Sequence, residues 1–148
     1  MTLFMENIFF KGQVLWSMID ANRHLRHSAY SDLCTQARSN LMSIIGLSIN
    51  SCAKFGIAPI LFREETIFHR EIKMDEEIYV TVEMTKHNLT NNRFSITQTV
   101  YKNDGTKSAT VNVDGAWLDL KTRKLTNLPS EIVQLFNKIP KHESYLEE

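Results

Sequence analysis

A short segment rich in ionisable side chains separates two apolar stretches near the start of the chain. It reads Asp20-Ala21-Asn22-Arg23-His24-Leu25-Arg26-His27-Ser28-Ala29-Tyr30 and follows Trp16-Ser17. The periodicity after it predicts a helix, and the first turn of a helix presents unpaired backbone N–H groups and a partial positive charge. Such an end suits an anion or a developing oxyanion, and Asp20 just upstream would supply a base or a nucleophile. The alternative is a structural role, in which Asp20 only binds loop amides.

The predicted helix covers residues 28–45. Its apolar residues recur at helical spacing and form one stripe, namely Tyr30, Leu33, Cys34, Ala37, Leu41, Ile44 and Ile45. The opposite arc is polar and carries Asp32, the only acid on the helix. We expect Ser28 to cap the N-terminus and Gly46 to end the helix in a left-handed conformation. At about 1.5 Å per residue, the helix is long enough to cross a small sheet.

Alternation of apolar and polar residues predicts strands at 8–16, 57–72, 78–84, 94–101 and 109–120. The run Asn103-Asp104-Gly105 predicts a hairpin turn, and Gly115 predicts a bulge in the last strand. A short helix at 130–138 follows Pro129, and we expect the tail after it to fray. No strand–helix–strand alternation appears, so the sheet should be antiparallel with the long helix on one face.

The composition indicates one globular domain. The 148 residues (17.1 kDa), of which 43% are apolar and 23% charged, are unlike a disordered or fibrous chain. Seventeen basic side chains balance seventeen acidic ones, which argues against a general nucleic-acid binder or a binder of anionic membranes.

The expected cellular setting follows from three features of the sequence. Cys34 and Cys52 are too few for a disulfide framework and are expected to be reduced. The start of the chain, Met1-Thr2-Leu3-Phe4-Met5-Glu6, does not have the pattern of a secretory signal. No stretch approaches the ~20 apolar residues of a membrane span. We therefore expect a cytoplasmic protein without a membrane span.

A set of residues around the first segment resembles a known family. Trp16-Ser17, Ile19-Asp20-Ala21-Asn22, His24-Leu25, Tyr30 and Ala37-Arg38, leading into an antiparallel sheet, are similar to the hotdog-fold acyl-CoA thioesterases of the 4-hydroxybenzoyl-CoA thioesterase type. The likeness covers about residues 7–128 and is specific in 20–38. It implies an α+β hotdog fold in which an antiparallel sheet of five to six strands wraps around one long central helix. A single domain then spans 1–148, with a short C-terminal helix and tail at 129–148.

The resemblance also implies an activity and a site. The family hydrolyses an acyl-CoA to a carboxylic acid and free coenzyme A without a dissociable cofactor. Asp20 stands at the place of the family's general base or nucleophile, and the backbone N–H of His27 at the place of the group that polarises the thioester carbonyl. His24, Ser28 and Tyr30 are the expected substrate-binding residues. Family members assemble as homodimers or as tetramers made of two dimers, with their sites between subunits.

The chain departs from the family at three positions. Many relatives have Gly at the place of Arg23 and an Asn pair at the places of Arg26 and His27. A side-chain role for the second Asn is therefore not carried over, whereas the backbone N–H role survives any residue except proline. These departures keep a second function open, namely a protein that binds an acyl thioester of coenzyme A or acyl-carrier protein without hydrolysing it.

Two other branches of the fold fit the sequence less well. One branch places its catalytic carboxylate on the central helix, but Asp32 lies on the arc opposite the apolar stripe. The dehydratase branch has a His-Phe-Pro type motif that this chain lacks. His24 and His27 are a weak zinc signal without further ligands, and we expect no metal.

Further residues remain open between a functional and a structural role. Cys34 lies in the apolar stripe and is expected to pack, and Arg38 either pairs with a carboxylate across a subunit contact or is solvated. Gln98 needs a hydrogen-bond partner or touches substrate. Alternation places Glu64 and Glu65 on opposite faces of a strand, and one of them either joins the site of a neighbouring subunit or is an edge charge.

Two sets of residues are candidates for holding the substrate. The cations that would bind the phosphates of coenzyme A are Arg63, Arg70, Lys86, Arg93, Lys102 and Lys107. The aromatic residues that would shape an acyl pocket are Trp16, Phe55, Phe62 and Phe68.

Overall fold

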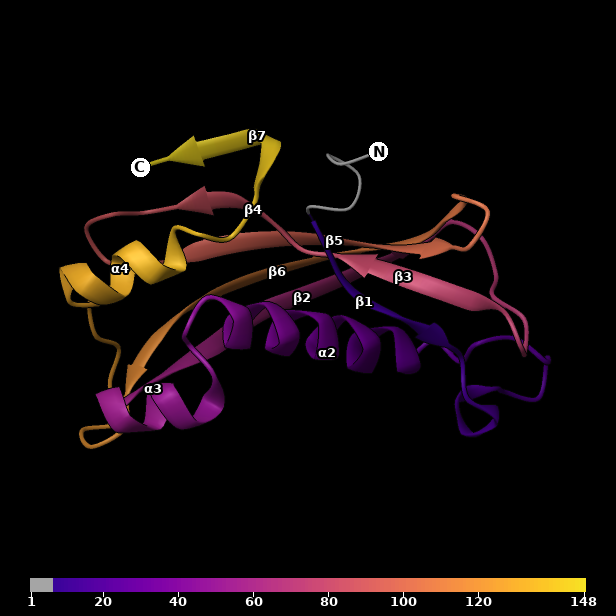
Figure 1. Cartoon of the computed structure of the whole chain (residues 1–148), viewed down its shortest axis with the longest axis horizontal. Helices are drawn as coiled ribbons and strands as arrows, with labels where there is room; N and C mark the ends of the chain where they lie inside the picture. The colour runs from indigo at the N-terminus through magenta and orange to yellow at the C-terminus, as the bar shows by residue number, and fades with distance from the viewer. Residues whose placement is uncertain (1–6) are drawn as a thin grey trace.

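The long helix α2 (Ala29–Ile44) packs against one face of a seven-stranded sheet (Figure 1). The structure is a computed structural model that describes residues 7–148. The prediction about a secretory signal concerns residues 1–6, which lie outside the described residues. None of the helices within 7–148 is long and apolar enough to cross a membrane.

Neighbouring strands run antiparallel across five places in the sheet, as expected, when β3 and β4 share one place. Their order is β1 (Ile8–Gln13), then β3 (Glu77–Thr81) continued by β4 (Glu83–His87), then β5 (Phe94–Lys102), β6 (Lys107–Asp119) and β2 (Ile57–Phe68). The strands β3 and β4 both pair with β5 and are interrupted at Val82, so they are two parts of one bent strand. The predicted turn at residues 103–105 joins β5 to β6, and Gly105 adopts a φ of 88° there.

The prediction that the C-terminal tail frays is wrong. Residues Lys141–Glu147 form strand β7, which pairs in parallel with β4, and the N–H of Glu148 donates to the carbonyl of His87 at 2.9 Å. The outer edge of β4 offers unpaired backbone groups beyond the end of β1, and the tail satisfies them. With the two parts of the bent strand counted separately the sheet has seven strands, and β4 and β7 form a parallel pair in it.

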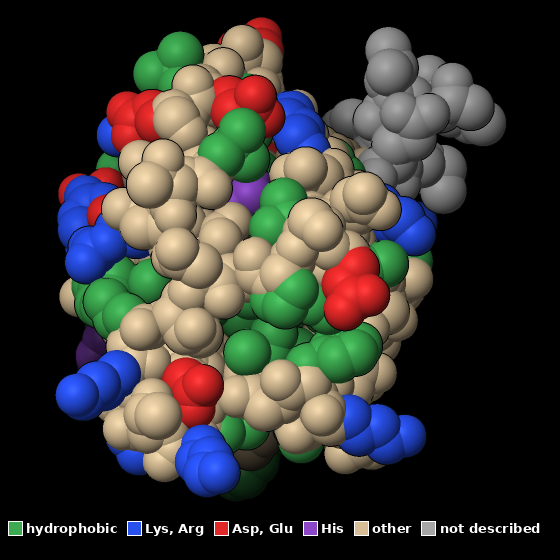
Figure 2. All heavy atoms as spheres, turned by 90° about the vertical axis from the view of Figure 1, so that its left-hand side faces the viewer, with side chains coloured by type: hydrophobic (Ala, Val, Ile, Leu, Met, Phe, Trp, Pro, Cys, Tyr) green, Lys and Arg blue, Asp and Glu red, His purple; other side chains and the backbone are tan. Residues whose placement is uncertain are grey.

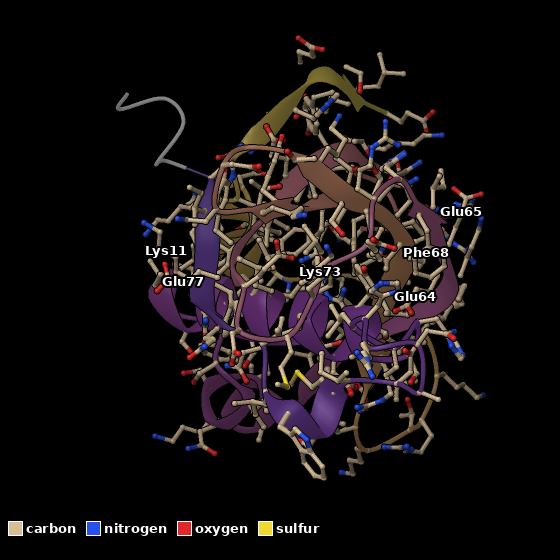
Figure 3. The ribbon with its side chains drawn as sticks, turned by 90° about the vertical axis from the view of Figure 1, so that its right-hand side faces the viewer. Lys11, Glu64, Glu65, Phe68, Lys73 and Glu77 are labelled. Atoms are coloured by element: carbon tan, nitrogen blue, oxygen red, sulfur yellow. The ribbon has the colours of Figure 1, made fainter. Side chains whose placement is uncertain are left out.

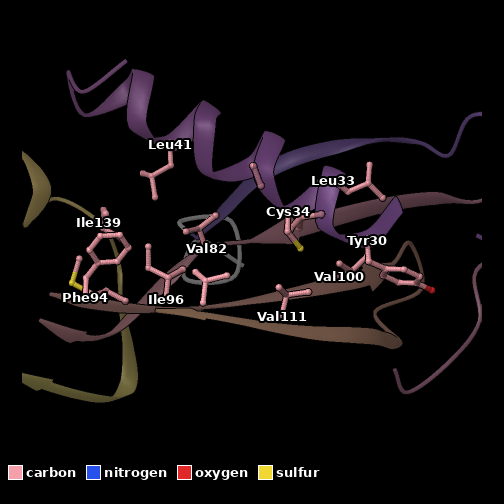
Figure 4. Close-up of a cluster of buried hydrophobic side chains, with 14 of the residues drawn as sticks. Tyr30, Leu33, Cys34, Leu41, Val82, Phe94, Ile96, Val100, Val111 and Ile139 are labelled. Atoms are coloured by element: carbon pink, nitrogen blue, oxygen red, sulfur yellow. The ribbon is translucent and has the colours of Figure 1, made fainter. Parts of the chain in front are cut away.

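The apolar stripe of α2 forms the centre of the core. Tyr30, Leu33, Cys34, Ala37 and Leu41 are all buried. Figure 4 shows Tyr30, Cys34 and Leu41 on the side of the helix that faces the sheet. The exception is Ile44, which is 72% exposed because Ile45, four residues after Leu41, takes the buried position. Gly46 follows with a φ of 93°, as predicted for the end of the helix.

A second helix, α3 (Ile49–Phe55), was not expected from the sequence. The Ser48 side chain accepts a hydrogen bond from the Ser51 N–H at its start, and Gly56, with a φ of 74°, ends it. It leads directly into β2. The predicted C-terminal helix is present as α4 (Ser130–Phe136), whereas the first two strands end earlier than predicted, at Gln13 and Phe68.

The irregularity predicted at Gly115 lies on the neighbouring strand. The register between β2 and β6 shifts between Leu61 and Arg63, so the extra residue is Phe62, opposite Gly115. A Cβ on Gly115 would lie 2.4 Å from the carbonyl oxygen of Ile60 and 2.5 Å from the Phe94 ring. Glycine is needed here because backbone and ring approach closely, and the partner strand carries the bulge.

Candidate active site

The segment between the 3-10 turn η1 (Trp16–Met18) and α2 is a tight loop that is tied to a distant part of the chain. Within the loop, the Asp20 N–H donates to the carbonyl of His24 at 2.9 Å. Outside it, the Leu25 N–H donates to the carbonyl of Ile72 at 2.7 Å, and His24 forms a β-bridge with Lys73. The loop therefore has a fixed position relative to the segment that precedes β3.

The Asp20 carboxylate is held by one of its two oxygens. Oδ1 accepts hydrogen bonds from the N–H groups of Asn22 at 2.8 Å and His24 at 3.3 Å. Within residues 7–148, Oδ2 accepts no hydrogen bond. The structural role considered from the sequence is thus present, because Oδ1 orders the loop, while Oδ2 has no partner among the described residues.

The start of α2 offers donors beside this carboxylate. Ser28 occupies the N-cap position, as predicted, but its side chain makes no capping hydrogen bond. Ser28 Oγ instead accepts a hydrogen bond from Arg26 Nε at 3.0 Å. Within the described chain, the backbone N–H groups of His27 and Ser28 have no acceptor. Unpaired N–H groups at a helix N-terminus attract negative charge.

Four of the five predicted site residues line one pocket of about 310 Å³, namely Asp20, His24, His27 and Tyr30. Ser28 is exposed and does not line it. The pocket also involves Leu25 and the segment 68–71 at the end of β2. Figure 3 looks onto this end of the molecule and shows Phe68 on β2, the strand beside the first turns of α2.

Tyr30 contributes its ring more than its hydroxyl. The side chain is 3% exposed, and its hydroxyl lies 3.2 Å from Ser108 Oγ, which in turn donates to the carbonyl of Arg70. Burial raises the pKa of the Tyr30 phenol. The ring of Phe68 packs edge-on against it with centroids 5.2 Å apart. The phenol stays protonated and forms the floor of the pocket.

Sequence reasoning missed Glu71 as a member of the site. Its Oε2 lies 3.1 Å from Nε2 of His24, so the two side chains pair at the rim of the pocket. Nothing local in the sequence links them, because the contact depends on the bridge between His24 and Lys73.

Arg26, at one of the places where many relatives have asparagine, is held by hydrogen bonds within the loop. Its backbone N–H donates to the carbonyl of Met18, and its Nη1 donates to the carbonyl of Ser17 at 2.6 Å. With the bond to Ser28, the guanidinium ties both ends of the loop together. Its Nη2 is also 3.9 Å from Asp32, which is an exposed carboxylate at the helix surface.

Of the other residues considered from the sequence, some line this pocket and others pack in the core or form ion pairs elsewhere. Cys34 is fully buried, and burial raises the pKa of its thiol to about 12, so it packs rather than acts as a nucleophile.

Of the proposed phosphate-binding cations, only Arg70 lines the pocket, while Arg63 pairs with Glu65 and Asp114. Lys86 pairs with Glu148 and Lys102 with Glu76. Of the four proposed aromatic residues, Phe68 lines this pocket, and Trp16 lines a neighbouring pocket that also contains Asp20 and His24. No group of three or more His, Cys, Asp or Glu side chains in residues 7–148 could hold a metal ion.

Comparisons with known proteins agree with this architecture. Residues 14–136 match the thioesterase-like superfamily. The structure is similar to the hypothetical protein SAV2348 from Staphylococcus aureus, solved in complex with CoA (20% identity, 91% of this chain and 87% of that chain covered, TM-score 0.79). It is also similar to a DHNA-CoA thioesterase from Staphylococcus aureus (17%, 89% and 89%, 0.79).

A third similar structure is Slr0204 from Synechocystis, a 1,4-dihydroxy-2-naphthoyl-CoA thioesterase (17% identity, 86% of this chain and 93% of that chain covered, TM-score 0.75). At these identities the likeness concerns the fold, and the hotdog fold expected from the sequence is confirmed. A search of curated proteins found no match.

The backbone of the loop provides a first test. Arg23, at the position where many relatives have Gly, has a φ of 67°. That left-handed conformation costs a residue with a Cβ about 1–2 kcal/mol, of which glycine's greater freedom in the unfolded chain cancels about 0.5–1 kcal/mol. We expect Arg23→Gly to raise the free energy of unfolding by up to about 1 kcal/mol, as measured by urea denaturation.

The matched control is Lys73→Gly, in the segment bridged to the loop and without a positive φ. It should lower the free energy of unfolding by roughly 0.5–1 kcal/mol. A lower stability of Arg23→Gly would contradict the strain argument and would mean that contacts of the Arg23 side chain outweigh it.

Proposed function

Because the chain belongs to the thioesterase-like superfamily, we propose that it hydrolyses an acyl-CoA thioester to a carboxylic acid and free coenzyme A. The observation that carries this proposal is the free Oδ2 of Asp20, in a pocket that also contains the start of α2. The similar structures include a DHNA-CoA thioesterase, a 1,4-dihydroxy-2-naphthoyl-CoA thioesterase and one protein solved with CoA.

The proposed reaction uses the two features that meet in the pocket. The thioester carbonyl oxygen accepts a hydrogen bond from the N–H of His27, where the positive end of α2 stabilises the oxyanion of the tetrahedral intermediate. Asp20 either attacks the carbonyl carbon or removes a proton from the water that attacks it. If Asp20 attacks, the C–S bond breaks to leave a mixed anhydride between Asp20 and the acyl group, and water then hydrolyses that anhydride to the carboxylic acid and restores the carboxylate. If Asp20 acts as the base, the water oxygen forms the new C–O bond directly and the C–S bond breaks. On both routes the thiolate of coenzyme A takes up a proton released from the water.

The neighbouring side chains have supporting roles in this proposal. His24, oriented by Glu71, contacts the substrate at the rim of the pocket, and the Tyr30 ring packs against the group next to the carbonyl. Ser28 lies outside the pocket lining and its hydroxyl already binds Arg26, so in this proposal it only adds a second unpaired backbone N–H to the positive end of α2. No dissociable cofactor takes part.

The two carboxylates near the start of α2 separate catalysis from helix stabilisation. Asp20→Asn keeps the shape and the hydrogen bonds to Oδ1 but removes the base, so turnover of acyl-CoA should fall at least ~100-fold. Asp32→Asn is the matched control, because Asp32 is 71% exposed and lies outside the pocket. It should cost about 0.3–1 kcal/mol of stability and leave turnover nearly unchanged. A thiol-reporter assay across short, medium, long and aromatic acyl-CoAs measures the rates.

Thermal melting of both variants shows whether they are folded. An active, folded Asp20→Asn together with an inactive Asp32→Asn would mean that the wrong carboxylate has been assigned. Saturable binding of acyl-CoA with an intact thioester after long incubation would instead identify the protein as a non-catalytic acyl-thioester binder.

The open edge of β2 supports a homodimer as part of this proposal. Within the described chain, β2 pairs with β6 alone, and Leu61, Phe62, Ile67 and Phe68 on β2 are each at least 42% exposed. An exposed, apolar edge strand is a ready surface for pairing with a second copy. Light scattering at micromolar concentration should give a mass of at least twice 17.1 kDa, whereas a mass near 17.1 kDa would contradict a dimer.

A further inference from the structure

A second cavity lies at the opposite end of α2. Its volume is about 490 Å³, within the range of about 300–1,000 Å³ typical of small-molecule sites. It is enclosed by the C-terminal half of α2, by α3, by the start of β2 and by the inner face of the sheet. Most of its lining is apolar and includes Leu41, Met42, Ile57, Leu61, Phe94 and Ile139. Figure 4 shows Leu41, Phe94 and Ile139 between α2 and the sheet.

The cavity opens to solvent through hydrophobic side chains. Ile49 of α3 lines it and is 81% exposed, and it does not belong to the β2 edge proposed above for dimer contact. Figure 2 looks onto this end of the molecule, where hydrophobic side chains gather in the middle of the face. An aliphatic ligand therefore has a route from solvent into the cavity.

The lining contains one cationic side chain, that of Arg38. Its Nη1 donates to Oε1 of Gln98 at 2.6 Å, and its Nη2 donates to Oγ1 of Thr35 at 3.0 Å. Gln98 is fully buried and is itself fixed, because its Nε2 donates to the carbonyl of Cys34 at 2.9 Å. The guanidinium is thus held in one orientation at the cavity wall. The two bonds use two of its five N–H donors, so three remain.

The positive charge of Arg38 has no paired counter-charge. Among residues 7–148 it forms no ion pair with a carboxylate. Glu64 of β2 acts on it electrostatically but lies beyond ion-pair distance. Burial lowers the pKa of Arg38, yet a guanidinium remains charged at neutral pH. A half-buried cation beside an apolar surface is costly unless an anion joins it.

We propose that this cavity binds an aliphatic carboxylate, with the hydrocarbon chain on the apolar lining and the carboxylate paired with the guanidinium of Arg38. Arginine suits this role because its planar fork binds both oxygens of a carboxylate. The cavity shares no lining residue with the Asp20 pocket, so the binding does not depend on the proposed hydrolysis.

The test compares two ligands that differ in their head group. Calorimetric titration of the full chain with decanoate should give saturable binding, and decan-1-ol should bind about 10-fold more weakly or worse because it lacks the charge-assisted hydrogen bonds. This comparison needs no variant. Equal affinity for the two ligands, or no saturable binding of decanoate, would overturn the proposal. Equal affinity is also the result expected if a carboxylate from a second copy already occupies Arg38.

Variants assign the binding to the cavity. Arg38→Met removes the charge and should reduce decanoate affinity to that of decan-1-ol, while decan-1-ol binding is kept. Ala53→Trp fills the cavity and should weaken both ligands. The control Arg123→Met, on an exposed arginine outside the cavity, should change neither. Unchanged decanoate affinity in folded Arg38→Met, with folding checked by circular dichroism and melting, would refute the role of Arg38.

The same titration separates this proposal from the proposed function. Asp20→Asn should bind decanoate with unchanged affinity, because Asp20 is not part of the cavity. Decanoate binding without turnover of any acyl-CoA would leave this site standing and remove the hydrolase proposal. Turnover of an acyl-CoA with equal affinity for decanoate and decan-1-ol would support the hydrolase proposal and overturn the cavity site.

Discussion

The burial of one helical stripe against the sheet is the interaction on which the rest of the structure depends. Once Leu33, Cys34, Ala37 and Leu41 pack on the inner face of the sheet, both the axis and the ends of α2 are fixed. The helix must then begin where the loop is tied to residues 72–73, and its start lines the same pocket as Asp20. The chemistry proposed here is a consequence of where the core allows the helix to start.

The helix α2 and the strand β2 also organise the surface between the two cavities. Tyr30 packs against Phe68 at one end, and Arg38 is influenced by Glu64 further along. Leu61 of β2 reaches the apolar cavity near the other end of the helix. The two elements therefore run in opposite directions, with the Asp20 pocket at the beginning of α2 and the aliphatic cavity toward its end. Figure 3 shows Glu64 on the α2 side of the strand and Glu65 pointing outward.

The sequence predicted the features that rest on local pattern and missed those that rest on distant contacts. The stripe of α2, its end at Gly46 and the β5–β6 turn follow from periodicity and turn chemistry, and all three are present. The helix α3 was missed although Ser48 and Gly56 mark its ends, because seven residues are too few to show a period. Strand β7 depends on the free edge of β4, which no local pattern reveals.

The site shows the same division. The loop from Asp20 to Tyr30 and the following helix start were identified from residue types and spacing, and the five site residues from the family resemblance. Four of these five residues line one pocket. The partner of His24 could not be predicted, because Glu71 reaches it only through a long-range β-bridge. The hydrogen bond from Arg26 to the Ser28 hydroxyl could not be predicted from the sequence either. Because of this bond, the Ser28 side chain does not cap the helix.

The most direct test of the central claim is a crystal structure with a non-cleavable acyl-CoA analogue in which a methylene group replaces the thioester sulfur. The ketone oxygen should lie within hydrogen-bond distance of the His27 N–H, with the carbonyl carbon facing Oδ2 of Asp20. An analogue whose carbonyl lies beside Glu64, away from the Asp20 carboxylate, would contradict the account.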